Sequence, residues 1–197
     1  MIEPACRDGA HATLLFPQLL DSMEQNTLVE AAVAAIVTAD LETEILVLKR
    51  KANPQDPWSG HYAFPGGRRD RQDSSLLDTC IRETFEECGV QLSPEALIKQ
   101  YPVRQAGNAL NQPVPVTTFL FELPQQPAIQ LQAGEISCHE WLDLKYAADK
   151  ANIVQRAMSP RFPEMLFPCI PATAGFVWGF TYEALMMVLA DRYPFFG

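Results

Sequence analysis

A pair of glycines ahead of an uninterrupted helical segment constrains this chain more than any other feature of its sequence. Gly66 and Gly67 close the run Phe-Pro-Gly-Gly, and the segment from Leu76 to Cys88 contains neither Gly nor Pro. Ser74 and Ser75 can each cap the first turn of a helix, and Gly89 stands where a C-terminal cap glycine is expected. The sequence therefore predicts a glycine turn followed by a helix that ends at Cys88.

Three glutamates, Glu83, Glu86 and Glu87, fall within a sector roughly 100° wide on this helix. Like charges three and four residues apart repel one another, and Arg82 can offset only one of them. Oxygen ligands of this kind bind hard divalent cations, and Mg²⁺ commonly combines one or two carboxylates with substrate phosphates. A solvated acidic face is the alternative, but the glycine turn one helix length upstream favours a metal site. The opposite side of the helix is expected to be buried, and it carries Leu77, Cys80, Ile81, Thr84, Phe85 and Cys88.

At these residues the sequence resembles the Nudix hydrolases. Their signature is Gly, five residues, Glu, seven residues, then Arg-Glu-x-x-Glu-Glu-x-Gly and an aliphatic residue. The second half is matched in full, from Arg82 to Val90. The first half departs from it, because the acidic position counted from Gly67 is Asp73 and eight residues separate Asp73 from Arg82. This variant is similar to the branch that contains the coenzyme A diphosphatases.

The resemblance implies an α/β fold, namely the Nudix α/β/α sandwich with a mixed central sheet. It also implies metal-dependent hydrolysis of a diphosphate by Mg²⁺ or Mn²⁺. The metal ligands would be the Gly67 carbonyl and Glu83, Glu86 and Glu87, with Arg82 orienting the carboxylates through an ion pair. The catalytic set would be Glu86, Arg82 and a base from the segment before a late tryptophan-bearing strand. Glu135 is the candidate base, ahead of Glu140, and a plain surface acid is the alternative for Glu135.

The substrate is expected to be a nucleoside diphosphate linked to another group, with coenzyme A or an acyl-coenzyme A as the first choice. Arg50, Arg68 and Arg69 are the candidate substrate-binding residues, since guanidinium groups pair well with phosphate oxygens. Arg50 fits the additional coenzyme A diphosphatase pattern, but Asp56 replaces its second arginine. That departure keeps ADP-ribose or another nucleotide sugar as the alternative. Asp70 and Asp73 are interpreted as solvated turn acids.

A non-catalytic nucleotide sensor with the same fold is a third hypothesis. Such a module would be expected to lose carboxylates and often to carry a DNA-binding segment, whereas all three glutamates are present here. A net charge of −9 argues against nucleic acid as the main partner. Five cysteines show no paired metal-ligand spacing, and no window approaches the length of a membrane span. We expect a cytoplasmic protein, and the resemblance allows a homodimer.

Taken in order, residues 1–27 are expected to form an N-terminal extension, and residues 28–197 the Nudix domain with a C-terminal helical segment. Strands are predicted over Leu28–Thr38 and Glu44–Lys49, which form a hairpin, and over Ile98–Arg104 and Val114–Leu123. Further elements are a helix over Leu144–Asn152, an irregular apolar segment over Val154–Gly175, and a C-terminal helix that ends near Asp191.

Overall fold

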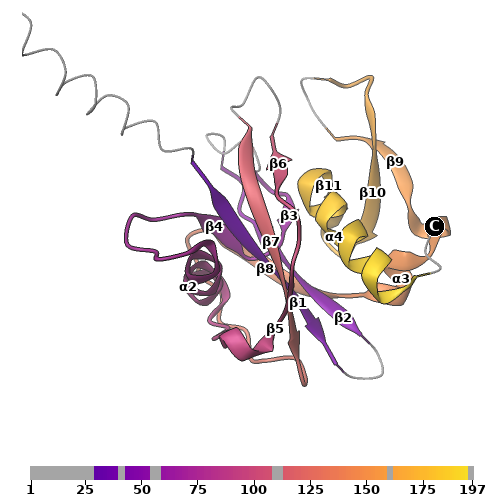
Figure 1. The fold of residues 1–197 in the computed structure, drawn as a ribbon. Helices are drawn as coiled ribbons and strands as arrows, with labels where there is room; N and C mark the ends of the chain where they lie inside the picture. The colour runs from indigo at the N-terminus through magenta and orange to yellow at the C-terminus, as the bar shows by residue number, and fades with distance from the viewer. Residues whose placement is uncertain (1–28, 40–42, 54–58, 108–112, 159–161, 195–197) are drawn as a thin grey trace, which may run out of the picture.

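The computed structural model describes residues 29–39, 43–53, 59–107, 113–158 and 162–194. The predicted extension over residues 1–27 lies outside these residues, as does Asp56, so the proposed domain boundary at residue 28 stays a prediction. Every element below belongs to the described part of the chain. The fold consists of a central sheet, a second small sheet, and helices on two sides (Figure 1).

The central sheet is mixed, as expected. Its path runs β3-β2-β1-β7-β5, while β4 pairs with β1, β6 with β7 and β8 with β2. The pair β1–β7 is parallel, with Ala31 opposite Val116 and Thr38 opposite Leu123, and the other pairs are antiparallel. Its strands are β1 (Ala31–Thr38), β2 (Glu44–Arg50), β3 (Tyr62–Ala63), β4 (Gly66–Arg68), β5 (Leu97–Gln100), β6 (Arg104–Ala106), β7 (Val114–Leu123) and β8 (Ile136–Asp143).

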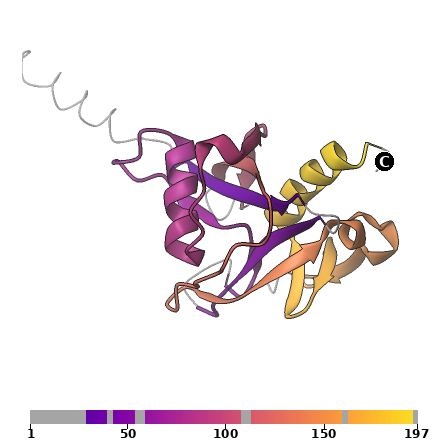
Figure 2. The same ribbon diagram turned by 90° about the horizontal axis from the view of Figure 1, so that it is seen from below.

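Helix α2 (Leu76–Cys88) and helix α4 (Gly179–Arg192) lie on opposite faces of this sheet (Figures 1 and 2). Alternation along β1 separates the two cores, because successive side chains of a strand point to opposite faces. Ala34 and Ile36 belong to the cluster that contains Cys80 and Cys88 of α2. Ala35 and Val37 belong to the cluster that contains the buried residues of α4. The predicted α/β/α sandwich is therefore confirmed.

A second, three-stranded antiparallel sheet precedes α4 and corrects the prediction of an irregular segment over Val154–Gly175. It consists of β9 (Val154–Ala157), β10 (Leu166–Ala172) and β11 (Gly175–Trp178), in the order β11-β10-β9. Pro168 and Pro171 both lie inside β10. Proline has no N–H to donate and argues against a strand when only the sequence is considered, which is why this sheet escaped prediction.

Two other boundaries differ from the predictions. The segment Ile98–Arg104 forms two strands, β5 and β6, because Pro102 lies between them and cannot donate to a ladder. The predicted helix over Leu144–Asn152 consists of α3 (Leu144–Ala148) and a 3₁₀ turn (Lys150–Asn152), and a further 3₁₀ turn spans Pro94–Ala96. Strand β7 and the end of α4 lie where they were predicted. Among the described residues, no helix is long and apolar enough to cross a membrane.

Candidate active site

The two glycines of the turn are required by close contacts on both sides. Gly66 has φ +144°, and a Cβ there would lie 2.2 Å from the Ala32 carbonyl oxygen, so a side chain would collide with β1. A Cβ on Gly67 would lie 2.5 Å from Oε2 of Glu83. The Gly67 backbone therefore lies directly against a carboxylate of α2.

Helix α2 begins and ends as the sequence predicts. The Ser75 hydroxyl accepts a hydrogen bond from the Asp78 amide at 3.1 Å, and Gly89, with φ +70°, donates its amide to the Phe85 carbonyl at 2.8 Å. Its buried face differs from the prediction, because Phe85 is 55% exposed whereas Glu87 is only 6% exposed. The glycine turn lies against part of the acidic sector, so this sector is not simply solvated.

Asp73, which precedes α2, and Arg82, in the middle of α2, form an ion pair with two hydrogen bonds. Nε and Nη2 of Arg82 donate to the two Asp73 carboxylate oxygens at 2.9 and 2.8 Å. The Thr79 hydroxyl and the Asp70 amide also donate to this carboxylate. The hydrogen bonds from Arg82, together with these other donors, hold the pKa of Asp73 well below its usual range despite its burial. The interpretation of Asp73 as a solvated turn acid is therefore wrong.

Arg82 also donates hydrogen bonds to two acids of its own helix. Its Nη1 donates to Oε1 of Glu83 at 2.8 Å and to Oε2 of Glu86 at 3.1 Å. The Glu86 side chain is 55% exposed, whereas that of Glu83 is 21% exposed. Burial raises the pKa of Glu83, and its contact with Arg82 only partly opposes this. One guanidinium group is thus shared among three carboxylates.

Glu87 is the least neutralised of these carboxylates. Its Oε2 accepts one hydrogen bond from the Gly66 amide at 3.0 Å, and the Nη1 of Arg50 lies 3.9 Å from its Oε1. Burial raises the pKa of Glu87 to about 7, and the negative charges of Glu83 and Glu135 act in the same direction. Glu135 lies in the exposed turn before β8, where its carbonyl accepts from the Lys51 amide at 2.7 Å. Its charge therefore reaches the Glu87 site from a different part of the chain.

A family model described as the NUDIX domain matches residues 29–162, which is more than half of the chain. The chain belongs to the NUDIX family. The sequence-based assignment to the Nudix hydrolases is thus confirmed for the family, and the matched region contains the glycine turn, α2 and Glu135.

The curated relatives match this chain only in part. An uncharacterized protein of Schizosaccharomyces pombe is 34% identical over 139 residues, which are 62% of this chain and 41% of that protein. The uncharacterized Nudix hydrolase NudL of Yersinia enterocolitica is 31% identical over 115 residues, which are 50% of this chain and 56% of NudL. The chain thus spans about half the length of the curated relatives it matches. A crystal structure of a MutT/nudix family protein from Enterococcus faecalis covers 92% of this chain and 69% of its own at 18% identity, and its TM-score of 0.58 supports the fold.

The donor chemistry of this Nudix site suits a hard divalent cation. Glu83, Glu86 and Glu87 offer carboxylate oxygens, and the Gly67 backbone borders Glu83. In the described part of the chain, no three His, Cys, Asp or Glu side chains are grouped so that they could hold a metal ion. Instead, Glu83 and Glu86 are paired with Arg82, and Glu87 accepts from the Gly66 amide. The single guanidinium of Arg82 and the Gly66 amide therefore offset only part of the repulsion among Glu83, Glu86 and Glu87.

The predicted substrate arginines differ in how strongly they are engaged. Arg69 closes the turn before α2, where its Nη2 donates to the Asp73 and Ser74 carbonyls at 3.3 and 3.2 Å. Arg50 faces Glu87, as described above. Arg68 is exposed at the end of β4 and is the register partner of Ala31. Its carbonyl accepts from Nη2 of Arg82 at 3.4 Å, and its exposed side chain is accessible to a phosphate.

Arg104 was not singled out from the sequence, yet it lies on the same register row as Arg68. The row runs Arg68–Ala31–Val116–Arg104 across β4, β1, β7 and β6. Residues on one row project from the same face of a sheet. Ala31 and Val116 pack with Phe180 of α4, so this is the face opposite α2. Both arginines are exposed, and neighbouring strands are about 4.8 Å apart, which puts the arginines about 14 Å from one another along the row.

Other residues considered from the sequence lie in structural contacts. Glu122 is paired with Arg192 of α4, and Glu140 accepts from the Tyr62 hydroxyl at 2.9 Å. Cys80 and Cys88 are buried as predicted, and each described cysteine is free.

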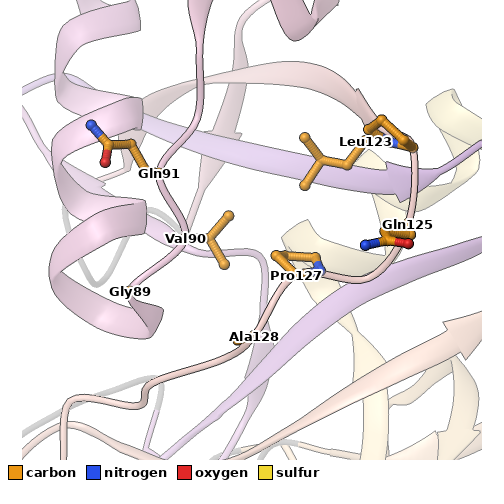
Figure 3. A pocket seen from close by; sticks show the side chains of 8 residues that line it. Gly89, Val90, Gln91, Leu123, Gln125, Pro127 and Ala128 are labelled. Carbon is orange, nitrogen blue, oxygen red and sulfur yellow. The ribbon is translucent and has the colours of Figure 1, made fainter.

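A hollow of about 360 Å³ beyond the end of α2 is lined by Val90, Leu123, Pro127 and neighbouring residues (Figure 3). It lies at the Leu123 end of β1 and β7, whereas Gly67 pairs with Ala32 near the start of β1.

Proposed function

We propose that this Nudix protein hydrolyses the diphosphate linkage of a nucleoside-diphosphate derivative with Mg²⁺ or Mn²⁺. The single observation that carries the proposal is the state of Glu87. A buried carboxylate with one amide donor, a distant arginine and two acidic neighbours is poorly stabilised by the protein alone. A divalent cation relieves this repulsion, and it brings to the site the positive charge that a diphosphate requires.

The proposed ligands are Glu83, Glu86, Glu87 and the Gly67 carbonyl. When bound, the metal ions supply Lewis-acid stabilisation of the phosphate oxygens and lower the pKa of a coordinated water. Arg82, held by Asp73, keeps Glu83 and Glu86 on the same side of the helix. Glu135 is exposed and within electrostatic reach of Glu87, and we assign it the role of accepting the proton from the attacking water.

Coenzyme A or an acyl-coenzyme A is the proposed substrate, with ADP-ribose or another nucleotide sugar as the alternative. Coenzyme A carries a 3′-phosphate in addition to its diphosphate, so its site needs extra positive charge. Exposed Arg68 and Arg104 on one register row supply such charge at the glycine-turn end of the sheet. This pair favours the 3′-phosphorylated substrate, although the net charge of the chain is −9.

A substrate panel tests the proposal. Coenzyme A, dephospho-coenzyme A, ADP-ribose, nucleotide sugars and nucleoside triphosphates are each incubated with the protein and Mg²⁺ or Mn²⁺, and products are separated by chromatography. We expect adenosine 3′,5′-bisphosphate and 4′-phosphopantetheine from coenzyme A, and a higher kcat/KM than for the dephosphorylated form. Equal values for the two would favour the nucleotide-sugar alternative. No turnover of any diphosphate would support the sensor hypothesis. A cytoplasmic location and a homodimer stay predictions from the sequence.

A further inference from the structure

The turn between β10 and β11 contacts the central sheet beside the strand that leads to the glycine turn. The Tyr62 hydroxyl donates to Oε2 of Glu140 at 2.9 Å, and the same carboxylate oxygen accepts from the Thr173 amide at 2.9 Å. The Ala174 amide donates to the Tyr62 oxygen at 3.2 Å, and Nζ of Lys49 donates to the Ala174 carbonyl. We name these five residues the latch. Tyr62 is 2% exposed, so its hydroxyl is held by these contacts and not by bulk water.

The two strands held by the latch lead to two residues that contact Glu87: β2 ends at Arg50, and β3 precedes Gly66, the first residue of β4. Lys49 on β2 is the register partner of Tyr62 on β3. The residue after Lys49 is Arg50, whose guanidinium faces Glu87, and four residues after Tyr62 is Gly66, whose amide donates to Glu87. A shift of β3 or of the end of β2 would therefore be transmitted over a few backbone bonds to the buried carboxylate.

A contact between two aromatic rings also joins the C-terminal sheet to the segment at β3. The rings of His61 and Trp178 meet edge to face with centroids 4.7 Å apart, and the His61 carbonyl accepts from the Arg50 amide at 3.0 Å. Trp178 ends β11 and precedes α4. The C-terminal sheet thus contacts β3 through both Tyr62 and the residue before it.

We propose that Tyr62 and Glu140 are positioning residues that hold the glycine turn and Arg50 against Glu87 through the β10–β11 turn. The contacts of Tyr62 and Glu140 given above are with each other and with the β10–β11 turn, so we assign their effect on the site to Gly66 and Arg50. The consequence for hydrolysis rests on the proposed function, whereas the positioning of Gly66 does not.

A matched pair of variants separates positioning from general stability. Tyr62→Phe removes the hydroxyl from the latch. Tyr101→Phe removes a hydroxyl that donates to Oδ2 of Asp191 on α4 at 2.8 Å, and Tyr101 is 4% exposed. Both tyrosines thus tie the C-terminal part of the chain to the central sheet, but only Tyr62 leads to the glycine turn. Glu140→Gln tests the acceptor of the latch if Tyr62→Phe does not fold.

The first measurement is hydrogen exchange of the Gly66 amide by NMR in the metal-free protein. We expect exchange about tenfold faster in Tyr62→Phe than in Tyr101→Phe after correction for global stability, since one hydrogen bond contributes about that factor. The second measurement is Mn²⁺ affinity by electron paramagnetic resonance, which should weaken about tenfold in Tyr62→Phe only. The third is kcat on the best substrate, which should fall with Mn²⁺ affinity.

Equal Gly66 exchange in the two tyrosine variants overturns the positioning role, whatever the activity of the protein. Faster exchange specific to Tyr62→Phe, in a wild-type protein that turns over no diphosphate, supports positioning and defeats the proposed function. If the wild type hydrolyses a diphosphate but Gly66 exchange in Tyr62→Phe is unchanged, the proposed function is supported and the positioning role is defeated. The positioning role is thus tested by Gly66 exchange, and the proposed function by diphosphate turnover.

Discussion

The two ends of α2 hold buried carboxylates in opposite states. Asp73 is 9% exposed and receives two hydrogen bonds from Arg82, one from Thr79 and one from Asp70. Glu87 is 6% exposed and receives one, from Gly66. Hydrogen bonds from Arg82 hold the pKa of Asp73 below its usual range, whereas burial raises the pKa of Glu87 to about 7 against a single amide donor and the more distant Arg50. The first carboxylate is stabilised by the fold, and the second is the one that the proposed cation would stabilise.

The comparison predicts that neutralising Glu87 affects activity far more than stability. We expect Glu87→Gln to lower kcat on the order of a thousandfold, because the variant loses a charged metal ligand while its shape is kept. Thermal unfolding of the metal-free variant should be unchanged or higher. Asp78→Asn, an exposed acid on the same helix, is the charge-matched control. Near-normal turnover of the Gln variant would defeat the metal site.

The opposite result is expected at the other end of the helix. Asp73→Asn removes the charge that neutralises Arg82, and breaking one side of such a pair costs about 3 kcal/mol of unfolding free energy. Urea unfolding monitored by circular dichroism measures this loss. Asp70→Asn is the control, since that exposed side chain accepts from the Gln72 amide and forms no ion pair with another described residue. A stability change no larger than that of the control would mean that the ion pair is not structural.

The pH dependence of stability should separate the two carboxylates. The folded-state pKa of Glu87, about 7, exceeds its ordinary value of 4.5, so its contribution to stability is complete below pH 4.5 and is lost as pH rises through 7. This loss amounts to roughly 3 kcal/mol in the metal-free protein. The lowered pKa of Asp73 acts in the other direction, with stability present above its ordinary pKa of 3.8 and lost below that range.

Unfolding free energies measured from pH 4.5 to 7.5 check this prediction. The wild-type protein without metal should lose stability across the range, and Glu87→Gln should show a flatter profile. Saturating Mn²⁺ should restore the wild-type stability at pH 7, because a bound cation favours the ionised carboxylate. A wild-type profile as flat as that of the Gln variant would contradict the assignment of the raised pKa to Glu87.

Local rules were sufficient to predict much of this architecture. The caps of α2 and the alternation of β7 follow from contacts within a few residues, so Ser75, Gly89 and Val114–Leu123 were placed correctly. The Nudix motif added the fold and the set of glutamates. The substrate and the roles of the site residues stay predictions, because neither is encoded in local spacing.

The failures share a different cause, since each depends on a partner distant in sequence or on the direction in which a helix packs. A helical wheel locates the acidic sector, but it does not reveal that the glycine turn covers Glu87 and leaves Phe85 exposed. The sequence does not show that Asp73 is paired with Arg82, which lies nine residues further along the chain. The prolines of β10 hide a strand that pairs with β9 and β11.

The smallest expected effect concerns the arginine row on the sheet face opposite α2. If Arg68 and Arg104 bind the 3′-phosphate, Arg104→Gln should raise KM for coenzyme A about fivefold, the loss expected for one exposed charge-assisted hydrogen bond. KM for dephospho-coenzyme A should be unchanged, since that substrate lacks the group. Arg68→Gln should behave in the same way, and Lys150→Gln, an equal charge change on the remote 3₁₀ turn, should alter neither.

Steady-state kinetics with both substrates separates binding from site assembly. A row that only binds the 3′-phosphate changes KM and leaves kcat intact, because the interaction is equally strong in the ground state and the transition state. An equal rise in KM for both substrates would mean that the arginines serve the diphosphate instead, as Arg50 beside Glu87 is positioned to do. A fall in kcat alone would tie the row to the glycine turn, since Arg68 accepts from Arg82 through its carbonyl.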